Sequence, residues 1–278
     1  MRAPISLSVF VTAFLTAASL TGFAQETPDH VNVPLTDPSR PAVVHASLMN
    51  GGITVTGYNG KEVIVEARPR HEGAHESKPD RKAEGMRRLD SRGSGLSVEE
   101  QDNEVNIGVS SMNRTVDLNI QVPFNTSLKL KCLNDGDIKV ERVSGEVDAD
   151  DLNGGVKLLN ISGSVVAHSL NEDVVVTLDQ VTPGRSMSFS TMNGDVDVTL
   201  PADVKARVKL KSDNGEIYSD FDVHPEANPA SPKVSETHGK DGRFRVQFDK
   251  VTYGSINGGG PEMQFTTFNG KIYLRKKK

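Results

Sequence analysis

Hydrophobic residues recur every nine positions through the middle of the chain. They form three columns, two of which lie two residues apart, so each repeat contains an apolar, variable, apolar triplet. That triplet has the period of a β-strand with one buried face. The pattern therefore predicts one short strand and one bend in every nine residues. The columns are Ile138, Val147, Val156, Val165 and Val174; Val140, Ala149, Leu158, Ala167 and Val176; and Val143, Leu152, Ile161 and Leu170.

Turn-forming residues separate these columns. Asn, Ser and Gly tolerate the tight or left-handed backbone that ends a strand. Asn-containing turns alternate with Ser-Gly turns, so the larger period is 18 to 19 residues with two strand-and-bend units per repeat. Similar units occur at 49–55, 192–198, 213–218 and 268–274. The predicted structural turn residues are Asn50, Gly51, Asn134, Gly136, Gly145, Asn153, Gly154, Gly163, Asn171, Asn193, Gly194, Asn214, Gly215, Asn269 and Gly270.

Two all-β architectures fit this spacing. In a single-stranded β-helix or β-solenoid of short strands, repeats stack about 4.8 Å apart and equivalent positions lie over one another. In an antiparallel β-sandwich, turns also occur about every 8 to 12 residues. The same residue type recurs in the same column, which favours the stacking of like on like. The β-solenoid is therefore the predicted fold, and the sandwich is the alternative.

The N-terminus has the features of a secretory signal peptide at residues 1–24. Arg2 provides a positive charge, an apolar stretch follows at 5–20, and small residues precede Gln25. We expect cleavage before Gln25. The apolar stretch is short for a membrane-spanning helix, so we expect no transmembrane segment after cleavage. The sequence thus predicts an exported protein of the periplasm or cell surface of a bacterium.

The rest of the chain forms one predicted domain. A polar lead-in at 25–40 precedes a β-strand-repeat domain at 41–275, and a basic tail follows at 276–278. Two segments without strand periodicity interrupt the domain, at about 69–95 and 224–242. Their Pro, Gly and charged residues predict loop excursions.

Charge and cysteine content limit the possible functions. The 278 residues carry a net charge of -5, which provides no attraction for nucleic acid. Cys132 is the only cysteine, so no internal disulfide can form and packing must supply the stability. Because it follows Leu128 and Leu130 at two-residue spacing, we expect Cys132 to be a buried strand residue.

The sharpest chemical motif is His71-Glu72-Gly73-Ala74-His75. On a helix, two histidines four residues apart can bind zinc, with the glutamate acting as general base. Pro69 and Pro79 bracket the segment, and no apolar stripe would seat such a helix on a core. A zinc metalloprotease through His71, Glu72 and His75 is therefore a remote alternative, and a solvated polar loop is the expectation.

Aspartates near the bends are the next candidates for chemistry. Calcium-binding β-rolls also repeat every nine residues, but they need a Gly-Gly-x-Gly-x-Asp motif whose second half is missing here. We therefore predict no metal site, and expect these carboxylates to solvate the outer face. They are Asp135, Asp137, Asp148, Asp150, Asp151, Asp173, Asp195 and Asp197.

A polysaccharide-active β-helix enzyme is a further alternative. Such an enzyme would use acids and bases that share one face of the stack. Asp148, Asp150, Lys157 and His168 could share such a face. Any polar solenoid face would offer a similar set, so we predict no catalytic and no cofactor-binding residues.

Several segments resemble a known family when taken together. They are the Asn-Gly-Gly-Ile-Thr-Val sequence at 50–55, the repeats at 133–176, the segment 192–201 and the C-terminal unit 268–274. They resemble the bacterial putative-adhesin family of exported β-strand-repeat proteins, a domain of unknown function, over most of residues 41–275. The resemblance implies a β-helix-like solenoid at the cell envelope. It brings no established catalytic residues to carry over.

The sequence favours an exported, non-enzymatic cell-envelope β-solenoid that acts as a binding, adhesin-like or scaffold protein. We expect its partner to be an envelope protein or a glycan of unknown identity, with no nucleic acid and no cofactor. Self-association through the ends of the solenoid is a further expectation. The exposed residues proposed as contacts are Lys139, Glu141, Asp148, Lys157 and His168.

Overall fold

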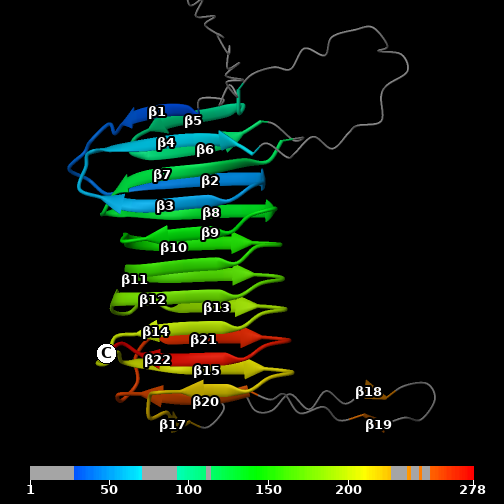
Figure 1. Cartoon of the computed structure of the whole chain (residues 1–278). Coiled ribbons are helices and arrows are strands. Elements are labelled where there is room, and N and C mark those ends of the chain that lie inside the picture. The colour runs from blue at the N-terminus through cyan, green and yellow to red at the C-terminus, as the bar shows by residue number, and fades with distance from the viewer. Residues whose placement is uncertain (1–27, 71–92, 111–113, 227–236, 239–243, 246–250) are drawn as a thin grey trace, which may run out of the picture.

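The computed structural model describes residues 28–70, 93–110, 114–226, 237–238, 244–245 and 251–278 (Figure 1). Within these ranges the protein is all-β and contains no helix, which confirms the predicted class. Twenty strands form one sheet that curls around a common core like a nearly closed barrel. The strands β18 (Thr237–His238) and β19 (Phe244–Arg245) form a separate antiparallel pair.

No helix in this described part of the chain has the length and hydropathy needed to cross a membrane.

The central strands pair in parallel, in two rows. In the first row β10 pairs with β8 and β11, and β11 also pairs with β13. In the second row β11 pairs with β9 and β12, and β12 pairs with β14. The long strand β11 therefore belongs to both rows. The bounds are β8 Thr126–Asn134, β9 Ile138–Glu141, β10 Ser144–Asp151, β11 Val156–Ser169, β12 Val174–Val181, β13 Met187–Thr191 and β14 Val196–Leu200.

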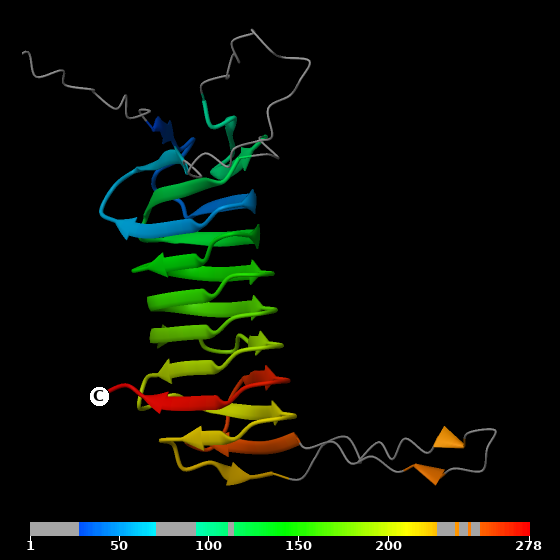
Figure 2. The same ribbon diagram turned by 45° about the vertical axis from the view of Figure 1, so that its right-hand side comes forward.

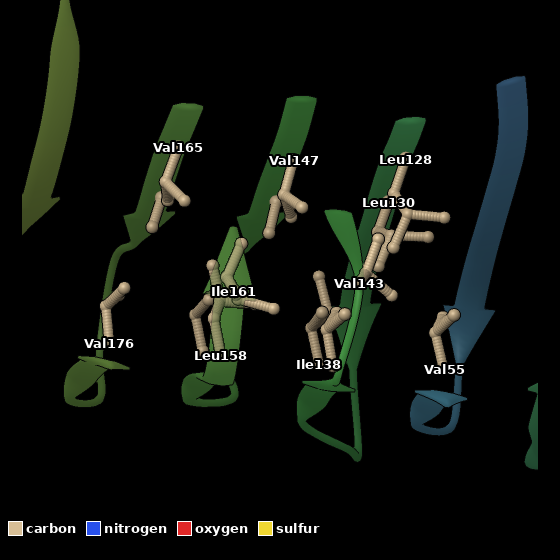
Figure 3. Close-up of a cluster of buried hydrophobic side chains, with 14 of the residues drawn as sticks. Val55, Leu128, Leu130, Ile138, Val143, Val147, Leu158, Ile161, Val165 and Val176 are labelled. Carbon is tan, nitrogen blue, oxygen red and sulfur yellow. The ribbon is translucent and has the colours of Figure 1, made fainter. Parts of the chain in front are cut away.

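The register places alternate copies of the nine-residue repeat in the two rows. Val147 pairs with Val165 in one row, whereas Val156 pairs with Ile138 and Val174 in the other. All five side chains are buried. Figure 3 shows Val147 and Val165 on successive strands of the first row and Ile138 among the side chains of the second. Stacked neighbours are thus 18 residues apart, as the larger sequence period predicts.

The third apolar column behaves differently from the prediction. Val143 and Ile161 are buried, but Leu152 is 37% exposed and Leu170 is half-buried. The column alternates because Val143 and Ile161 precede the Ser-Gly bends, whereas Leu152 and Leu170 lie beside the Asn turns at the outer edge.

The first coil of the stack is inserted between later segments of the chain. Strand β2 pairs in parallel with both β6 and β8, and β3 pairs in parallel with both β7 and β9. The bounds are β1 Asp29–Pro34, β2 Ala42–Asn50, β3 Ile53–Tyr58, β4 Glu62–Pro69, β5 Leu96–Gln101, β6 Glu104–Val109 and β7 Val116–Pro123. The segment 25–40, predicted to be a polar lead-in, contains the strand β1. This strand forms because Val31 and Val33 alternate with polar residues, and Val33 is buried.

The C-terminal coil is inserted in the same way. Strand β21 pairs in parallel with β13 and β15, and β22 pairs in parallel with β14 and β16. Figure 1 shows this red coil between green and yellow coils that precede it in the sequence. The bounds are β15 Ala206–Ser212, β16 Ile217–Ser219, β17 His224–Pro225, β20 Val251–Ile256, β21 Glu262–Thr267 and β22 Ile272–Lys276.

Antiparallel pairs of the large sheet lie toward its two ends. They are β1–β4, β4–β7 and β5–β6 near one end and β15–β20 and β17–β20 near the other. Figure 2 shows, from a second direction, that the coils between them remain stacked in one direction. The parallel pairing of these coils differs from the antiparallel sandwich alternative.

The core consists largely of Val, Ile and Leu side chains from both rows. Burial of each such side chain stabilises the fold by roughly 1.5–3 kcal/mol. Where the C-terminal coil enters, Phe189 stacks on Phe265 with a distance of 5.0 Å between ring centroids. Cys132 is 1% exposed, which confirms that it is a core residue. Burial raises the pKa of its thiol to about 12.

Candidate functional site

The turns at one edge of the stack bring seven asparagines into a single ladder. Six hydrogen bonds join them, and in each the Nδ2 of one asparagine donates to the Oδ1 of the asparagine on the adjacent coil, at distances of 2.8–3.3 Å. Ladders of this kind tie adjacent strands together. Every asparagine predicted as a structural turn residue takes part. Their order along the stack is Asn50, Asn134, Asn153, Asn171, Asn193, Asn269 and Asn214.

The glycines predicted as turn residues lie where adjacent coils approach closely, but Gly145 and Gly163 lie within the strands β10 and β11 and not in turns. A Cβ atom placed on Gly51 would stand 1.9 Å from the backbone oxygen of Val116, and one on Gly163 would stand 1.9 Å from that of Gly145. The others would meet backbone atoms of a neighbouring coil at 1.8–2.4 Å. These others are Gly136, Gly145, Gly154, Gly194, Gly215 and Gly270.

A polar hollow of about 650 Å³ opens beside these turns, near the N-terminal half of the stack. Charged side chains from four segments line it, and backbone of the turns at 136 and 154 forms part of its wall. The charged residues that matter here are Arg70, Asp117, Asp135, Asp137, Lys139 and Glu172. Both signs of charge are therefore present in one concave site.

Arg70 is held firmly at one side of the hollow. Its Nε and Nη2 each donate to a carboxylate oxygen of Asp117 at 2.6 Å, and its Nη1 donates to the backbone oxygen of Asp135 at 2.6 Å. The bond with Asp117 raises the pKa of Arg70, so the guanidinium stays charged. Asp117 Oδ1 also accepts the N–H of Gly52 at 2.9 Å, which fixes the carboxylate on the adjacent coil.

Asp137 is the second fixed carboxylate. Partial burial alone would raise its pKa. The ion pair with Lys139 at 3.1 Å, the hydrogen bond from the N–H of Gly155 at 3.2 Å and the positive charge of Arg70 together lower the pKa below its ordinary value. Asp137 is therefore ionised at neutral pH. Together with Arg70 it presents fixed charges and hydrogen-bonding groups to the hollow.

This arrangement suits the binding of a polar ligand. The guanidinium, ammonium and carboxylate groups bond to one another or to backbone, so they are preorganised to orient hydroxyl, amide or charged groups of a ligand. Among the described residues, no group of three or more His, Cys, Asp or Glu side chains is placed to hold a metal ion.

The contacts proposed from the sequence lie on two different faces. Asp148, Asp150 and His168 are close in register on β10 and β11 of the first row. Lys157 belongs to the other half of β11, where it pairs with Lys139 of β9 in the second row. Lys157 therefore does not share a face with the other three. Glu141 also lies on the second row, opposite Leu159.

His71, Glu72 and His75 lie outside the described residues, as do the predicted signal peptide and most of both loop excursions. The zinc motif and the cleavage site therefore stay predictions.

The prediction that all eight bend aspartates lie on the outer face is wrong for one of them. Seven are at least partly exposed, but Asp151 is fully buried. Its position follows Val147 and Ala149 at two-residue spacing, so the strand period itself turns Asp151 inward. The alternation of the apolar columns carried this signal.

Two features of the surface were not predicted from the sequence. Arg70 stands at the edge of the 69–95 excursion, and its sequence neighbours give no sign of the distant Asp117. The second feature is a row of outward apolar side chains, one directly before each of six ladder asparagines. We call this row the apolar ridge; it consists of Met49, Leu133, Leu152, Leu170, Met192 and Phe268.

Comparison with solved structures finds distant likenesses to bacterial proteins. The first is to a crystal structure described as a putative cell adhesion protein from Clostridium sporogenes ATCC 15579, with 13% identity, a TM-score of 0.43 and coverage of 90% of this chain and 100% of the other. The second is to a putative adhesin from Bacteroides fragilis NCTC 9343, with 11% identity, a TM-score of 0.33 and coverage of 91% and 98%.

No family model matches the chain, and no curated protein matches it either. The resemblance to the putative-adhesin family therefore stays a prediction from the sequence motifs.

Proposed function

We propose that the protein is an exported, non-enzymatic β-solenoid of the bacterial cell envelope that binds a partner protein or glycan along its turn edge. The parallel stacking of coils supports the solenoid assignment, because equivalent positions pair across adjacent coils throughout the central strands. A stack of this kind offers a long, regular surface whose side chains are held in fixed positions.

The observation that carries the binding proposal is the apolar ridge. Met49, Met192 and Phe268 are 45–47% exposed, and Leu152 is 37% exposed. Six coils at about 4.8 Å spacing make a ridge about 24 Å long. Contiguous exposed apolar surface of this kind is uncommon on monomeric proteins and typically marks an interaction site.

The surroundings of the ridge are polar. The asparagine ladder borders it, and the polar hollow opens beyond the same turns at Asn153 and Gly154. An apolar strip with a polar border is the usual composition of a protein interface. A partner that covered the ridge could place polar groups in the hollow.

The chemistry of the hollow supports a non-enzymatic role. Arg70, Asp117, Asp137 and Lys139 bond to each other or to backbone, so their charges serve to fix the turns. The thiol of Cys132 is buried and protonated at neutral pH.

A binding experiment tests the proposal. The purified mature protein is screened against peptidoglycan fragments, envelope glycans and envelope proteins, and the Kd of each hit is measured. A double variant, Met192→Ser with Phe268→Ser, removes two exposed side chains of the ridge, and we expect it to weaken binding at least tenfold, roughly 1.4 kcal/mol.

Val166→Ser is the matched control, because Val166 is 45% exposed but lies within β11, where it pairs with Ser188, and is not part of the ridge. It should leave the Kd unchanged. If the wild type binds none of these partners, or if the ridge variant binds as well as the control, the proposal is wrong. Release of reducing sugar from any of the glycans would contradict the non-enzymatic role.

A further inference from the structure

A column of buried polar side chains runs just inside the asparagine turns. Its members occupy equivalent register positions at the ends of successive parallel strands. Each is at most 5% exposed. In spatial order they are Cys132, Asp151, Ser169, Thr191, Thr267 and Ser212.

Five of these six side chains are donors to a turn carbonyl of the adjacent coil. Ser169 Oγ donates to Gly154 O and Ser212 Oγ donates to Gly270 O, each at 2.9 Å. The other three bonds are Thr191 to Glu172 O at 2.8 Å, Thr267 to Gly194 O at 2.9 Å and the Cys132 thiol to Gly51 O at 3.3 Å. At every position of the column except Asp151, a hydroxyl or thiol group therefore donates a hydrogen bond to the adjacent coil.

Asp151 has one satisfied and one unsatisfied oxygen. Its Oδ1 accepts the N–H of Gly154 at 2.7 Å. Its Oδ2 is buried and has no hydrogen-bond partner among the described residues. A buried polar atom without a partner costs about 1–3 kcal/mol, so its surroundings need an explanation.

The local geometry supplies one. The position of a Cβ on Gly154 lies 2.0 Å from Gly136 O and 2.9 Å from Asp151 Oδ2. The position of a Cβ on Gly215 lies 1.8 Å from Gly270 O and 2.9 Å from the Ser212 Oγ that donates to that carbonyl. Asp151 Oδ2 therefore occupies the place of a donor hydroxyl, facing the carbonyl oxygen of Gly136.

Two oxygens that are both acceptors would repel each other at this place unless a proton lies between them. We propose that Asp151 is a neutral carboxylic acid in the folded protein at mildly acidic pH, that its Oδ2–H donates to the backbone oxygen of Gly136, and that loss of this proton loosens the turn beside the polar hollow. The stack would then contain a built-in pH-sensitive joint between the coils of β8 and β10.

The groups around Asp151 favour the neutral form. Burial raises its pKa to about 6, and the negative charges of Asp137 and Asp150 act in the same direction against the N–H groups of Asn153 and Gly154. On β8 its neighbour is the protonated Cys132, and on β11 it is the uncharged Ser169.

The sign of the pH effect follows from this raised pKa. An acid whose pKa is higher in the folded chain than its ordinary 3.8 contributes stability that is fully present below about pH 4 and is lost as the pH rises through about 6. The hydrogen bond with Ser94 lowers the pKa of Asp29, so that group loses stability only at more acidic pH. The difference between the wild type and Asp151→Asn over the range from pH 5 to pH 8 therefore isolates the contribution of Asp151.

Thermal unfolding between pH 5 and pH 8 tests the proposal. We expect the midpoint of the wild type to rise by several degrees on acidification from pH 8 to pH 5. Asp151→Asn keeps the acceptor for Gly154 and replaces the acid proton with an amide donor, so its midpoint should vary much less and should exceed the wild-type value at pH 8. Asp148→Asn, at an exposed position of the same strand and not among the charges that act on Asp151, should keep the wild-type pH dependence.

The proposal is overturned if Asp151→Asn retains the full pH dependence of the wild type, or if it is less stable than the wild type at pH 8. A direct measurement covers the case in which the variant does not fold. The side-chain carboxyl carbon of Asp151 in the wild type, followed by ¹³C NMR, should titrate above pH 5. A midpoint below pH 4 would show an ordinary ionised carboxylate and end the proposal.

Discussion

Glycine at the turns is a steric requirement that can be stated atom by atom. A Cβ on Gly270 would lie 1.9 Å from the backbone oxygen of Gly194 and 2.6 Å from its carbonyl carbon. Backbone atoms of an adjacent, paired coil cannot move aside cheaply. The close approach of coils thus depends on the missing side chain.

We expect Gly270→Ala to destabilise the protein by about 1–3 kcal/mol, the usual cost of overpacking a closely packed region. Denaturant unfolding would measure the loss. Gly108→Ala is the control, because a Cβ on Gly108 meets no atom within 4 Å. Equal stability of the two variants would contradict the steric argument.

Turn residues could be predicted from the sequence because their chemistry is local. The Asn-Gly turns at 153–154, 193–194, 214–215 and 269–270 lie between strands, whereas Gly145 and Gly163 lie within β10 and β11. Asp151 shows where the prediction stopped: residue type suggested solvent, whereas the two-residue period after Val147 and Ala149 placed the side chain inside. The position in the strand, and not the residue type, determined that Asp151 is buried. The proposed proton on its Oδ2 could not be predicted from the sequence, because it depends on the position of the Gly136 backbone oxygen.

The asparagine ladder acts at the scale of whole elements, because each bond joins two coils. Asn171 lies inside the ladder: it donates to Asn153 Oδ1 at 2.8 Å and to Leu152 O at 3.2 Å, and accepts from Asn193 at 3.0 Å. Asn214 makes one ladder bond, to Asn269 Oδ1 at 2.9 Å.

We therefore expect Asn171→Ala to cost about 1–3 kcal/mol and Asn214→Ala to cost roughly 1 kcal/mol or less, since each exposed bond contributes at the lower end of the usual range. Urea unfolding of the two variants measures the difference. A cost at Asn214 equal to or above that at Asn171 would show that the ladder does not act as a connected series.

The two-residue period of the strands and the number of residues between stacked positions could also be predicted from the sequence. The 18-residue spacing of Val147 and Val165 matches their pairing in register. What could not be predicted was which face each side chain joins, as Lys157 shows, because β11 passes from one row to the other within a single strand. Likewise Arg70 reaches Asp117 across 47 residues, a contact that no local pattern encodes.

At the scale of the molecule, the order of coils departs from the order of the sequence at both ends. The coil β2–β3 enters between β6–β7 and β8–β9, and β21–β22 enters between β13–β14 and β15–β16. Repeats that stack like on like do not specify their neighbours, since every Asn turn can bond to every other. The insertion was therefore invisible in the repeat pattern.

The inserted C-terminal coil should hold the stack together. A chain that ends at residue 261 lacks β21 and β22, which leaves β13 and β14 without their partners on that side and removes the stacking of Phe265 on Phe189. Unpaired edges of this length favour association with other chains. We expect this truncated chain to elute as aggregates in size-exclusion chromatography and to lose its cooperative unfolding transition.

A chain that ends at Lys276 provides the control, because it keeps both strands and loses the exposed ion pair of Lys277 with Asp179, which is worth about 0–1 kcal/mol. It should elute at the position of the full-length chain, with a nearly unchanged midpoint. In the contrary outcome the stack closes up in the shorter chain, with β13 paired directly to β15, and that chain elutes without aggregates and unfolds at the wild-type midpoint. That result would show that like-on-like stacking alone determines stability and that the insertion contributes nothing to it.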